Sequence, residues 1–390
     1  MMLGGSTTSL LAFINGLDLE KFEVDLQLFE NKGDFLKYIP EGVNLLPEAK
    51  KYKGRLSKLV KAFKYVFSGY YFKVARVKKK YNSRGWRVGI ITDFRAKVLS
   101  IKSQKHYDYA IGYLEGWSDR YLAYCVNADK KYAWLHSTFA NITDAPEAEK
   151  EWMQCVDKIV FVTDACRMAF SESVPSMESK AITVKNIIDS SIINKRAVDI
   201  AFSDTELDTF VKSDKTKIIT VCRLDIKTKG LDRIINAAKV LKSEGCRFVW
   251  YILGDGGAGV DKILEMAEEA GVGDVVFAIG SRINPYPYVK NADIMCMPSR
   301  YEGKPMVITE SMILGTPPVV TNYLSANEQI KNGEDGIIVE NDDESIVEPL
   351  RNCIQNPRVI HEMHECLLNN EYGNRDYIFE IEKMLFKDEI

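Results

Sequence analysis

Residues 217–253 read KIITVCRLDIKTKGLDRIINAAKVLKSEGCRFVWYIL. The stretch begins and ends with short runs of β-branched and aromatic residues, which predict strands at 217–222 and 248–253. Between them, residues 231–241 place apolar side chains at helical spacing after Gly230. Strand, helix and strand in this order predict two parallel strands, and the continuous apolar runs are typical of strands buried on both faces.

The same alternation continues on both sides of this stretch. The C-terminal half predicts a helix at 263–270, a helix after Pro305, and strands at 275–280, 294–298 and 318–321. The N-terminal half repeats the pattern less regularly, with strand candidates at 22–29, 43–46, 109–114, 132–135, 158–163 and 182–184. We therefore predict an α/β chain of two Rossmann-like domains, 1–190 and 191–365. Parallel sheets bind ligands beyond their carboxyl edges, so two such domains facing each other would enclose a cleft.

The composition is that of an ordinary globular protein. The chain has 390 residues, of which 46% are hydrophobic and 27% charged, and its net charge of −3 gives no argument for nucleic-acid binding. No apolar run is long enough to span a bilayer. The eight cysteines form no C-x-x-C pair and predict reduced thiols. His361, His364 and Cys366 lie close in sequence, but their polar surroundings favour a surface helix over a metal site.

Two glutamates, Glu302 and Glu310, stand eight positions apart around a turn that contains Gly303 and Pro305. An apolar run precedes the first glutamate, and a helical pattern carries the second. A helix N-terminus suits a phosphate, and carboxylates suit the hydroxyls of ribose or hexose. The pair therefore indicates a sugar-nucleotide site, although two surface glutamates beside a helix would give the same local pattern.

Further polar residues follow the ends of predicted strands. Arg223 and Lys229 are two cations that could neutralise a leaving diphosphate. His136 ends another strand, where a structural histidine is the alternative. Residues 254–259 satisfy G-x-G-x-x-G and so allow a dinucleotide-binding dehydrogenase. That reading is disfavoured, because the acidic residue about 20 positions on, Asp274, precedes a strand instead of ending one.

Together these motifs resemble the retaining glycosyltransferases of family 4, which have the GT-B fold, and in particular bacterial enzymes that build capsule, exopolysaccharide or O-antigen units. The resemblance covers nearly the whole chain. Its motifs, in order, are Gly4-Gly5, residues 133–136, residues 185–189, residues 222–225, residues 229–231, residues 253–256, residues 298–303 and Glu310. It implies retention of anomeric configuration, no metal or other cofactor, and a helical tail at 366–390 that returns to the first domain.

The resemblance also implies a role for each matching residue. Glu302 would contact hydroxyls of the donor sugar, Glu310 would contact the ribose, and His136 would contact a sugar hydroxyl. Arg223 and Lys229 would assist departure of the diphosphate. The remaining donor-binding positions are Gly4, Gly5, Gly254, Asp255, Ser281, Arg282, Gly303, Lys304, Pro305, Met306 and Val307. Thr7 stands where the family often has a glutamate, so a carboxylate role is not expected there.

Two features of the N-terminal half stand apart. Only three residues precede Gly4, so the first domain is expected to lack its first strand. Residues 50–91 contain fourteen basic residues and no acidic one, with aromatic residues at helical spacing. This pattern fits an amphipathic helix on an anionic membrane surface, and equally a helix packed on the domain's own sheet.

The sequence thus predicts transfer of a hexose from a nucleotide diphosphate sugar, with UDP-sugar as the expected donor, to a carbohydrate or lipid-linked saccharide. The expected location is the cytoplasm or the inner face of the cell membrane. Two alternatives stay open at this point. One is another GT-B enzyme, such as a sugar-nucleotide epimerase, and the other is a non-catalytic sugar-nucleotide-binding protein.

Overall fold

A computed structural model describes residues 5–49, 85–143, 146–199 and 204–386, with three further positions at Lys64, Phe67 and Gly69. The chain divides into two compact units. Unit 1 comprises Met1–Asn186 and Ile378–Ile390, and unit 2 comprises Ile187–Tyr377. The chain therefore passes between the units twice, whereas the sequence suggested breaks after residues 190 and 365.

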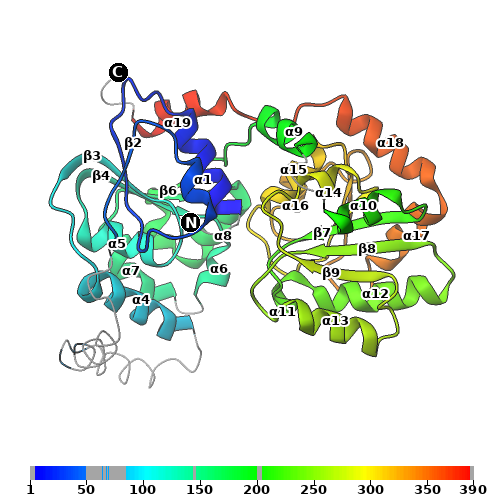
Figure 1. The fold of residues 1–390 in the computed structure, drawn as a ribbon. Coiled ribbons are helices and arrows are strands. Elements are labelled where there is room, and N and C mark those ends of the chain that lie inside the picture. Colours follow the sequence, from blue (N-terminus) through cyan, green and yellow to red (C-terminus); the bar gives the residue numbers. More distant parts are fainter. Residues whose placement is uncertain are drawn as a thin grey trace. The chain divides into compact units, whose positions relative to one another are not determined.

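Unit 2 is built on a six-stranded sheet in the order β12-β11-β10-β7-β8-β9, and every pairing is parallel (Figure 1). Its strands are β7 (Thr216–Val221), β8 (Phe248–Leu253), β9 (Val276–Gly280), β10 (Ile294–Met297), β11 (Pro318–Thr321) and β12 (Ile337–Val339). Parallel neighbours require crossover connections, which the helices between the strands supply. The predicted strands at 217–222, 248–253, 275–280, 294–298 and 318–321 are therefore confirmed within a residue or two at their ends.

Helices cover both faces of this sheet. They are α9 (Ser190–Val198), α10 (Thr205–Lys212), α11 (Ile226–Lys229), α12 (Leu231–Ser243), α13 (Val260–Glu269), α14 (Tyr286–Lys290), α15 (Met306–Ile313), α16 (Ala326–Gln329), α17 (Val347–Gln355) and α18 (Pro357–Leu368). One face packs against α12, α13 and α17, and the other packs against α9, α10, α14 and α15. The sheet is thus the middle layer of three.

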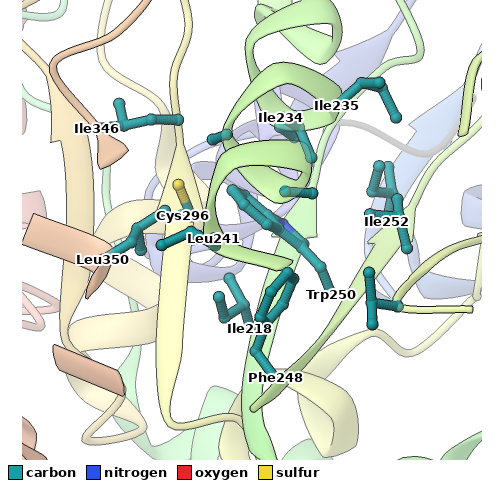
Figure 2. Packing of buried hydrophobic residues seen from close by; sticks show 14 of the residues in the cluster. Ile218, Ile234, Ile235, Leu241, Phe248, Trp250, Ile252, Cys296, Ile346 and Leu350 are labelled. Atoms are coloured by element: carbon teal, nitrogen blue, oxygen red, sulfur yellow. The ribbon is translucent and has the colours of Figure 1, made fainter. Parts of the chain in front are cut away.

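Strand β8 explains why its sequence is apolar at every position. Phe248, Trp250 and Ile252 enter the core beneath α12, as Figure 2 shows, while Val249 and Tyr251 enter the core on the opposite face. All six residues of the strand are buried. Successive side chains of a strand point to opposite faces, so a strand between two helical layers needs apolar residues throughout.

Unit 1 contains a four-stranded parallel sheet in the order β3-β4-β5-β6 and a separate parallel pair, β1-β2. These strands are β1 (Val24–Leu26), β2 (Val43–Leu45), β3 (His106–Gly112), β4 (Asn127–Leu135), β5 (Lys158–Phe161) and β6 (Ala181–Thr183). Its helices are α1 (Gly5–Gly16), η1 (Asp34–Tyr38), α4 (Gly85–Leu99), α5 (Trp117–Cys125), α6 (Phe139–Ile142), α7 (Pro146–Met153), α8 (Asp164–Ser173), η2 (Pro175–Lys180) and α19 (Tyr377–Leu385).

Two elements from opposite ends of the chain complete unit 1. Helix α1 packs Phe13 against Trp134, with ring centroids 5.6 Å apart. After α19, the ring of Phe386 lies 5.1 Å from that of Phe22, and the Tyr132 hydroxyl donates to the Leu385 carbonyl at 2.8 Å. The C-terminal segment therefore packs against unit 1, where it contacts strand β4 through Tyr132 and the N-terminal region through Phe22.

The predicted lack of a first strand stays a prediction, because residues 1–4 lie outside the described part of the chain. In that part of the chain α1 is the first element, and β1 and β2 pair with each other but share no ladder with β3. Side chains link the two sheets instead, because Tyr107 donates to Asp25 at 2.9 Å and Lys105 lies 3.1 Å from the same carboxylate. Gly4 lies outside the described residues.

Three elements of unit 2 were not predicted from the sequence, and one predicted segment of unit 1 lies mostly outside the described residues. Strand β12 and helices α9 and α10 were not predicted, since the first is only three residues long and the helices fall in a charged stretch. Most of the basic segment 50–91 lies outside the described residues, so its membrane and packing readings both stay predictions. Among the described helices, none combines the length and apolar character needed to cross a bilayer.

Candidate functional site

Glu302, which is predicted to bind the donor sugar, and Lys229, which is predicted to assist departure of the diphosphate, are in direct contact. Lys229 Nζ donates to Glu302 Oε1 at 2.7 Å, and the side chains are 18% and 9% exposed. Lys229 ends α11, and Glu302 lies in the loop that joins β10 to α15. Because most of this pair is removed from water, each charge needs the other, and the contact fixes an ammonium at the sheet's carboxyl edge.

The position of Lys229 is set by a short, strongly restrained turn. Asp225 caps α11 by accepting from the Thr228 backbone at 3.0 Å. Gly230 then ends α11 in the left-handed region, with φ of 66°. A Cβ at Gly230 would lie 2.1 Å from the Pro298 carbonyl oxygen, so no larger residue fits without moving the β10 loop. The glycine thus allows the two loops to touch.

Glu310 occupies a more enclosed position on α15. Its carboxylate is 7% exposed and accepts from the Tyr286 hydroxyl at 3.1 Å. Burial raises the pKa of Glu310 to about 7, while the Tyr286 hydrogen bond and the nearby Arg196 charge oppose that shift. The Arg196 guanidinium lies 4.8 Å from the centroid of the Tyr286 ring. Glu310 is therefore poised to change its charge near neutral pH.

Helix α15 begins between Glu302 and Glu310. The loop residues that precede it accept hydrogen bonds from two side chains at the ends of α16. Ser325 donates its hydroxyl to the Gly303 carbonyl, and Gln329 donates to the Pro305 carbonyl at 3.1 Å. Gly303 and Met306 are buried, while Lys304, Pro305 and Val307 are partly exposed. A helix N-terminus carries partial positive charge, so the predicted 303–307 segment is suited electrostatically to a phosphate.

Arg223 and the glycine-rich loop form the neighbouring part of the edge. Leu224 donates its backbone N–H to the Asp255 carbonyl at 2.9 Å, which ties the loop after β7 to the loop after β8. Gly257 has φ of 55°, and a Cβ there would lie 2.0 Å from the Leu224 carbonyl oxygen. The Arg223 side chain is 64% exposed, with Asp225 at 3.8 Å. It is thus a cation available to an incoming anion.

The predicted Ser281–Arg282 contact lies after β9. Ser281 is exposed, whereas the Arg282 guanidinium donates to Asp204 at 3.0 Å and to the Ile279 carbonyl at 2.6 Å. The side chain of Arg282 is therefore engaged within unit 2. The donor contact expected from Ser281 and Arg282 stays a prediction, and the Arg282 side chain would have to leave its present partners to make it.

In unit 1, His136 follows β4 directly and has a defined tautomer. Its Nε2 lies 3.1 Å from the Tyr113 carbonyl oxygen, which can only accept, so Nε2 carries the proton. Burial lowers the pKa of His136, although the nearby Glu115 carboxylate opposes this effect. The ring is therefore neutral near pH 7, and its Nδ1 is an acceptor for a hydroxyl.

Glu115 was not singled out from the sequence, yet it shapes this turn. Its carboxylate accepts from the His136 backbone N–H at 3.0 Å and from the Ser137 hydroxyl at 2.5 Å. A signal was present, because Glu115 follows the apolar run of β3 at the same sheet edge and precedes Gly116.

Gly5, predicted on the donor side, is the exposed first residue of α1.

The described residues also bear on the two disfavoured readings. Among them, no group of three His, Cys, Asp or Glu side chains could hold a metal ion. His364, from the suspected cluster, instead contacts the Gly315 carbonyl through Nδ1 at 2.6 Å. Helix α13 begins at Val260, immediately after the G-x-G-x-x-G stretch, but Asp274 precedes β9, as the sequence indicated.

Residues 204–371 match the family described as "Glycosyl transferases group 1". This region is most of unit 2 and contains Arg223, Lys229, Glu302 and Glu310. The match agrees with the resemblance stated from the motifs, and the narrower assignment to family 4 stays a prediction.

Curated relatives carry consistent names. A Haemophilus influenzae "Uncharacterized glycosyltransferase" is 27% identical over 56% of this chain and 58% of its own length. A Campylobacter jejuni N-acetylgalactosamine-N,N'-diacetylbacillosaminyl-diphospho-undecaprenol 4-alpha-N-acetylgalactosaminyltransferase is 29% identical over 45% of this chain and 44% of its own. The chain spans about half the length of these two relatives.

Solved structures match over nearly the whole chain. Anabaena Alr3699/HepE in complex with UDP and glucose superposes with a TM-score of 0.66 at 14% identity, covering 99% of this chain and 96% of that one. WaaG, a glycosyltransferase involved in lipopolysaccharide biosynthesis, gives 0.62 at 13% identity, covering 98% of each chain. At these identities the likeness shows the fold, which is the GT-B fold.

Proposed function

We propose, from the match of residues 204–371 to the group 1 glycosyltransferases, that this chain is a retaining glycosyltransferase. It transfers a hexose from a UDP-sugar to a hydroxyl of a carbohydrate or lipid-linked saccharide during synthesis of a surface polysaccharide. The observation that carries the proposal is the Lys229–Glu302 contact of 2.7 Å at the carboxyl edge of the unit 2 sheet. It presents a cation and a carboxylate where a sugar diphosphate needs both.

In the proposed reaction the bond between the sugar's anomeric carbon and the diphosphate oxygen breaks, and its electron pair leaves on the diphosphate. Lys229 and Arg223 stabilise that growing negative charge, so no metal is required. The acceptor oxygen bonds to the anomeric carbon from the face that the diphosphate leaves. The proton of the acceptor hydroxyl passes to the departing phosphate.

The carboxylates and the histidine hold the donor in place. Glu302 accepts from hydroxyls of the sugar, and Glu310 accepts from the ribose. His136 accepts from a further sugar hydroxyl at Nδ1, which its neutral Nε2–H tautomer leaves available. The relatives named as diphospho-undecaprenol glycosyltransferases support a lipid-linked acceptor for this chain.

Residues 50–91 supply the proposed contact with the membrane that would carry such an acceptor. Their fourteen basic residues and absence of acidic ones favour an anionic surface, and so a location on the inner face of the cell membrane. Binding to anionic vesicles should weaken strongly between low and high salt. Binding that is insensitive to salt would count against this part of the proposal.

Thermal-shift measurements with UDP, GDP, ADP and their sugars test the donor assignment. We expect UDP and one UDP-sugar to raise the melting temperature of the protein. The sugar of that UDP-sugar should then be transferred to a saccharide acceptor. Glu302→Gln should abolish most of the transfer, while Glu269→Gln, at an exposed carboxylate at the C-terminal end of α13, should leave it unchanged. Release of UDP at full rate without any acceptor would indicate an epimerase or hydrolase instead.

A further inference from the structure

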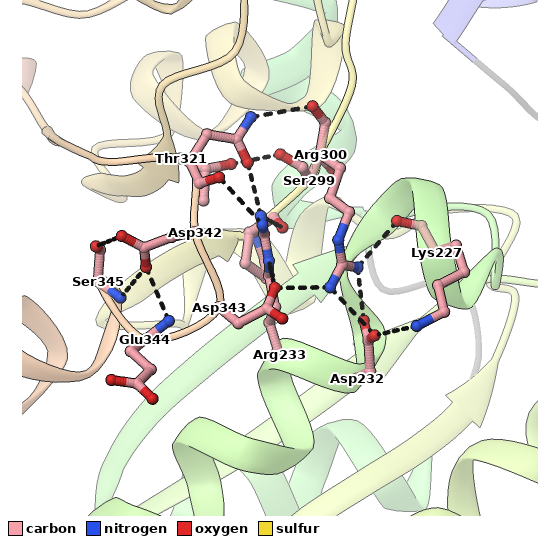
Figure 3. Close-up of polar contacts among 12 residues, drawn as sticks. Lys227, Asp232, Arg233, Ser299, Arg300, Thr321, Asp342, Asp343, Glu344 and Ser345 are labelled. Carbon is pink, nitrogen blue, oxygen red and sulfur yellow. Dashed lines mark hydrogen bonds and ion pairs between the residues drawn. The ribbon is translucent and has the colours of Figure 1, made fainter.

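Arg300, Asp232, Arg233 and Asp343 form a network of ion pairs (Figure 3) that lies close in sequence to both Lys229 and Glu302. Arg300, two positions before Glu302, donates to both oxygens of Asp232 at 2.8 and 3.2 Å. Asp232 is three positions after Lys229, in the first turn of α12. The two residues thus join the β10 loop to the turn between α11 and α12 at positions flanking the reactive pair.

Backbone contacts reinforce the same junction. Arg300 donates its guanidinium to the Lys227 carbonyl at 3.0 Å and its backbone N–H to the Thr228 carbonyl at 2.9 Å. Arg233, from α12, donates to the Pro298 carbonyl at 3.1 Å. The residues on either side of Lys229 are therefore bonded to the residues that precede Glu302.

The network also has an outer side. Asp343 accepts from Arg300 at 2.7 Å and from Arg233 at 2.8 Å, so one carboxylate bridges both guanidinium groups. The Arg300 and Asp232 side chains are 19% and 22% exposed. Partial burial and a two-point geometry distinguish this pair from an ordinary surface ion pair, which contributes little.

We propose that Arg300 and Asp232 are positioning residues that hold Lys229 and Glu302 at their contact distance for sugar transfer. The proposal rests on the proposed function. Arg300 is committed to Asp232, Asp343 and the Lys227 carbonyl, so it acts on the reaction through the loops it joins. Its role depends on the planar fork of arginine, which lysine cannot reproduce.

Steady-state kinetics of Arg300→Met and Arg300→Lys test this role. We expect kcat to fall about tenfold to 100-fold in both, because small misplacements of charge at a reacting centre have effects of this size. KM for the UDP-sugar should change much less, since Lys229 acts mainly on charge that develops as the bond breaks. Arg351→Met is the matched control, because Arg351 makes a similar two-point pair with Glu244 at 2.6 and 2.8 Å elsewhere in unit 2.

A double-mutant comparison separates positioning from a general loss of stability. In a Lys229→Met background, Arg300→Met should cost less than about threefold further, because the cation that it positions is already absent. Full additivity of the two losses would overturn the proposal. So would wild-type kcat in Arg300→Lys, or equal kcat losses in Arg300→Met and Arg351→Met.

Crystal structures of the wild type and Arg300→Lys give a readout that needs no turnover. The Lys229–Glu302 contact should lengthen beyond hydrogen-bond distance in the variant, and an unchanged contact would overturn the positioning role. If the wild type transfers no sugar and UDP causes no thermal shift, the proposed function fails. The crystallographic comparison then decides the positioning role alone.

Discussion

The two units place their candidate residues at the same kind of sheet edge but hold them by different means. In unit 2, Lys229 and Glu302 are bonded to each other and backed by the Arg300–Asp232 pair. In unit 1, the turn that carries His136 is held by one carboxylate, Glu115, and by the Tyr113 carbonyl. The comparison teaches that an ion pair between side chains fixes the unit 2 residues, whereas the neutral unit 1 histidine is oriented through backbone hydrogen bonds, one of them to a carboxylate.

Removing the central cation of unit 2 should have the largest effect. Lys229→Met leaves the Glu302 carboxylate without its 2.7 Å partner and removes positive charge from the diphosphate site. We expect kcat to fall by about 10²–10³, as for loss of one strong electrostatic group at a reacting centre. The measurement is initial-rate transfer from the UDP-sugar.

Lys212→Met provides the control for that experiment, because Lys212 is an exposed lysine at the end of α10. It should retain wild-type activity. If Lys229→Met keeps activity within threefold of wild type, the Lys229 charge does not stabilise the departing diphosphate.

The two cores differ in how they accommodate a fully buried tryptophan. Trp250 of unit 2 donates its ring N–H to Thr220 at 3.0 Å, whereas the ring nitrogen of Trp134 in unit 1 has no partner among the described residues. Trp250→Phe should therefore lower the free energy of unfolding by about 1–3 kcal/mol more than Trp134→Phe. Urea denaturation followed by circular dichroism checks this. Equal losses would show that the indole hydrogen bond adds nothing.

The pH response of nucleotide binding should distinguish Glu310 from the rest of unit 2. With a pKa of about 7, its ionised fraction rises from about one tenth at pH 6 to about nine tenths at pH 8. A ribose hydroxyl donates to the ionised form. UDP affinity, measured by calorimetry, should therefore rise about tenfold over this range beyond the change caused by UDP itself.

Glu310→Gln isolates that contribution, because it keeps the shape of the side chain and cannot ionise. Its UDP affinity should lack the tenfold rise. The raised pKa also implies that Glu310 favours the folded state most below its ordinary pKa of 4.5, and that this stabilisation is lost as pH rises through about 7. Affinity with the same pH slope in both proteins would exclude Glu310 from the nucleotide contact.

The smallest expected effect concerns the unit 1 turn. Glu115→Gln keeps an acceptor for the His136 backbone but removes the negative charge, so kcat/KM should fall about fivefold, as for loss of charge assistance in a hydrogen bond. Glu172→Gln, an exposed residue of α8, is the control. A loss as large as that of Lys229→Met would show that unit 1 also depends on charge.

The sequence predicted most of this fold because its strands and helices have strong local periodicity. Strand β8 and helix α12 are predictable from their own residues, since each buries an apolar pattern of the right period. Strand β12 is not, because its three residues are only partly buried and gain their place from pairing with β11. Short edge strands depend on neighbours that sequence spacing does not reveal.

The candidate site divides in the same way. Glu302, Glu310 and Lys229 were identified because they belong to ordered motifs. Arg300 lies inside one of those motifs, but its bond to Asp232 joins residues 68 positions apart and leaves no periodic trace. Glu115 was missed for a similar reason, since its partners His136 and Ser137 lie on the next strand's end.

The return of α19 to unit 1 has a consequence for synthesis of the protein. Unit 2 is one continuous stretch, Ile187–Tyr377, whereas unit 1 is assembled from both ends of the chain. A ribosome therefore releases all of unit 2 before it releases Leu385 and Phe386, which contact Tyr132 and Phe22. Unit 2 can therefore form its hydrophobic core before α19 is available to pack on unit 1. The segment that contains Leu385 and Phe386 can thus dock onto unit 1 only after the whole of unit 2 has left the ribosome.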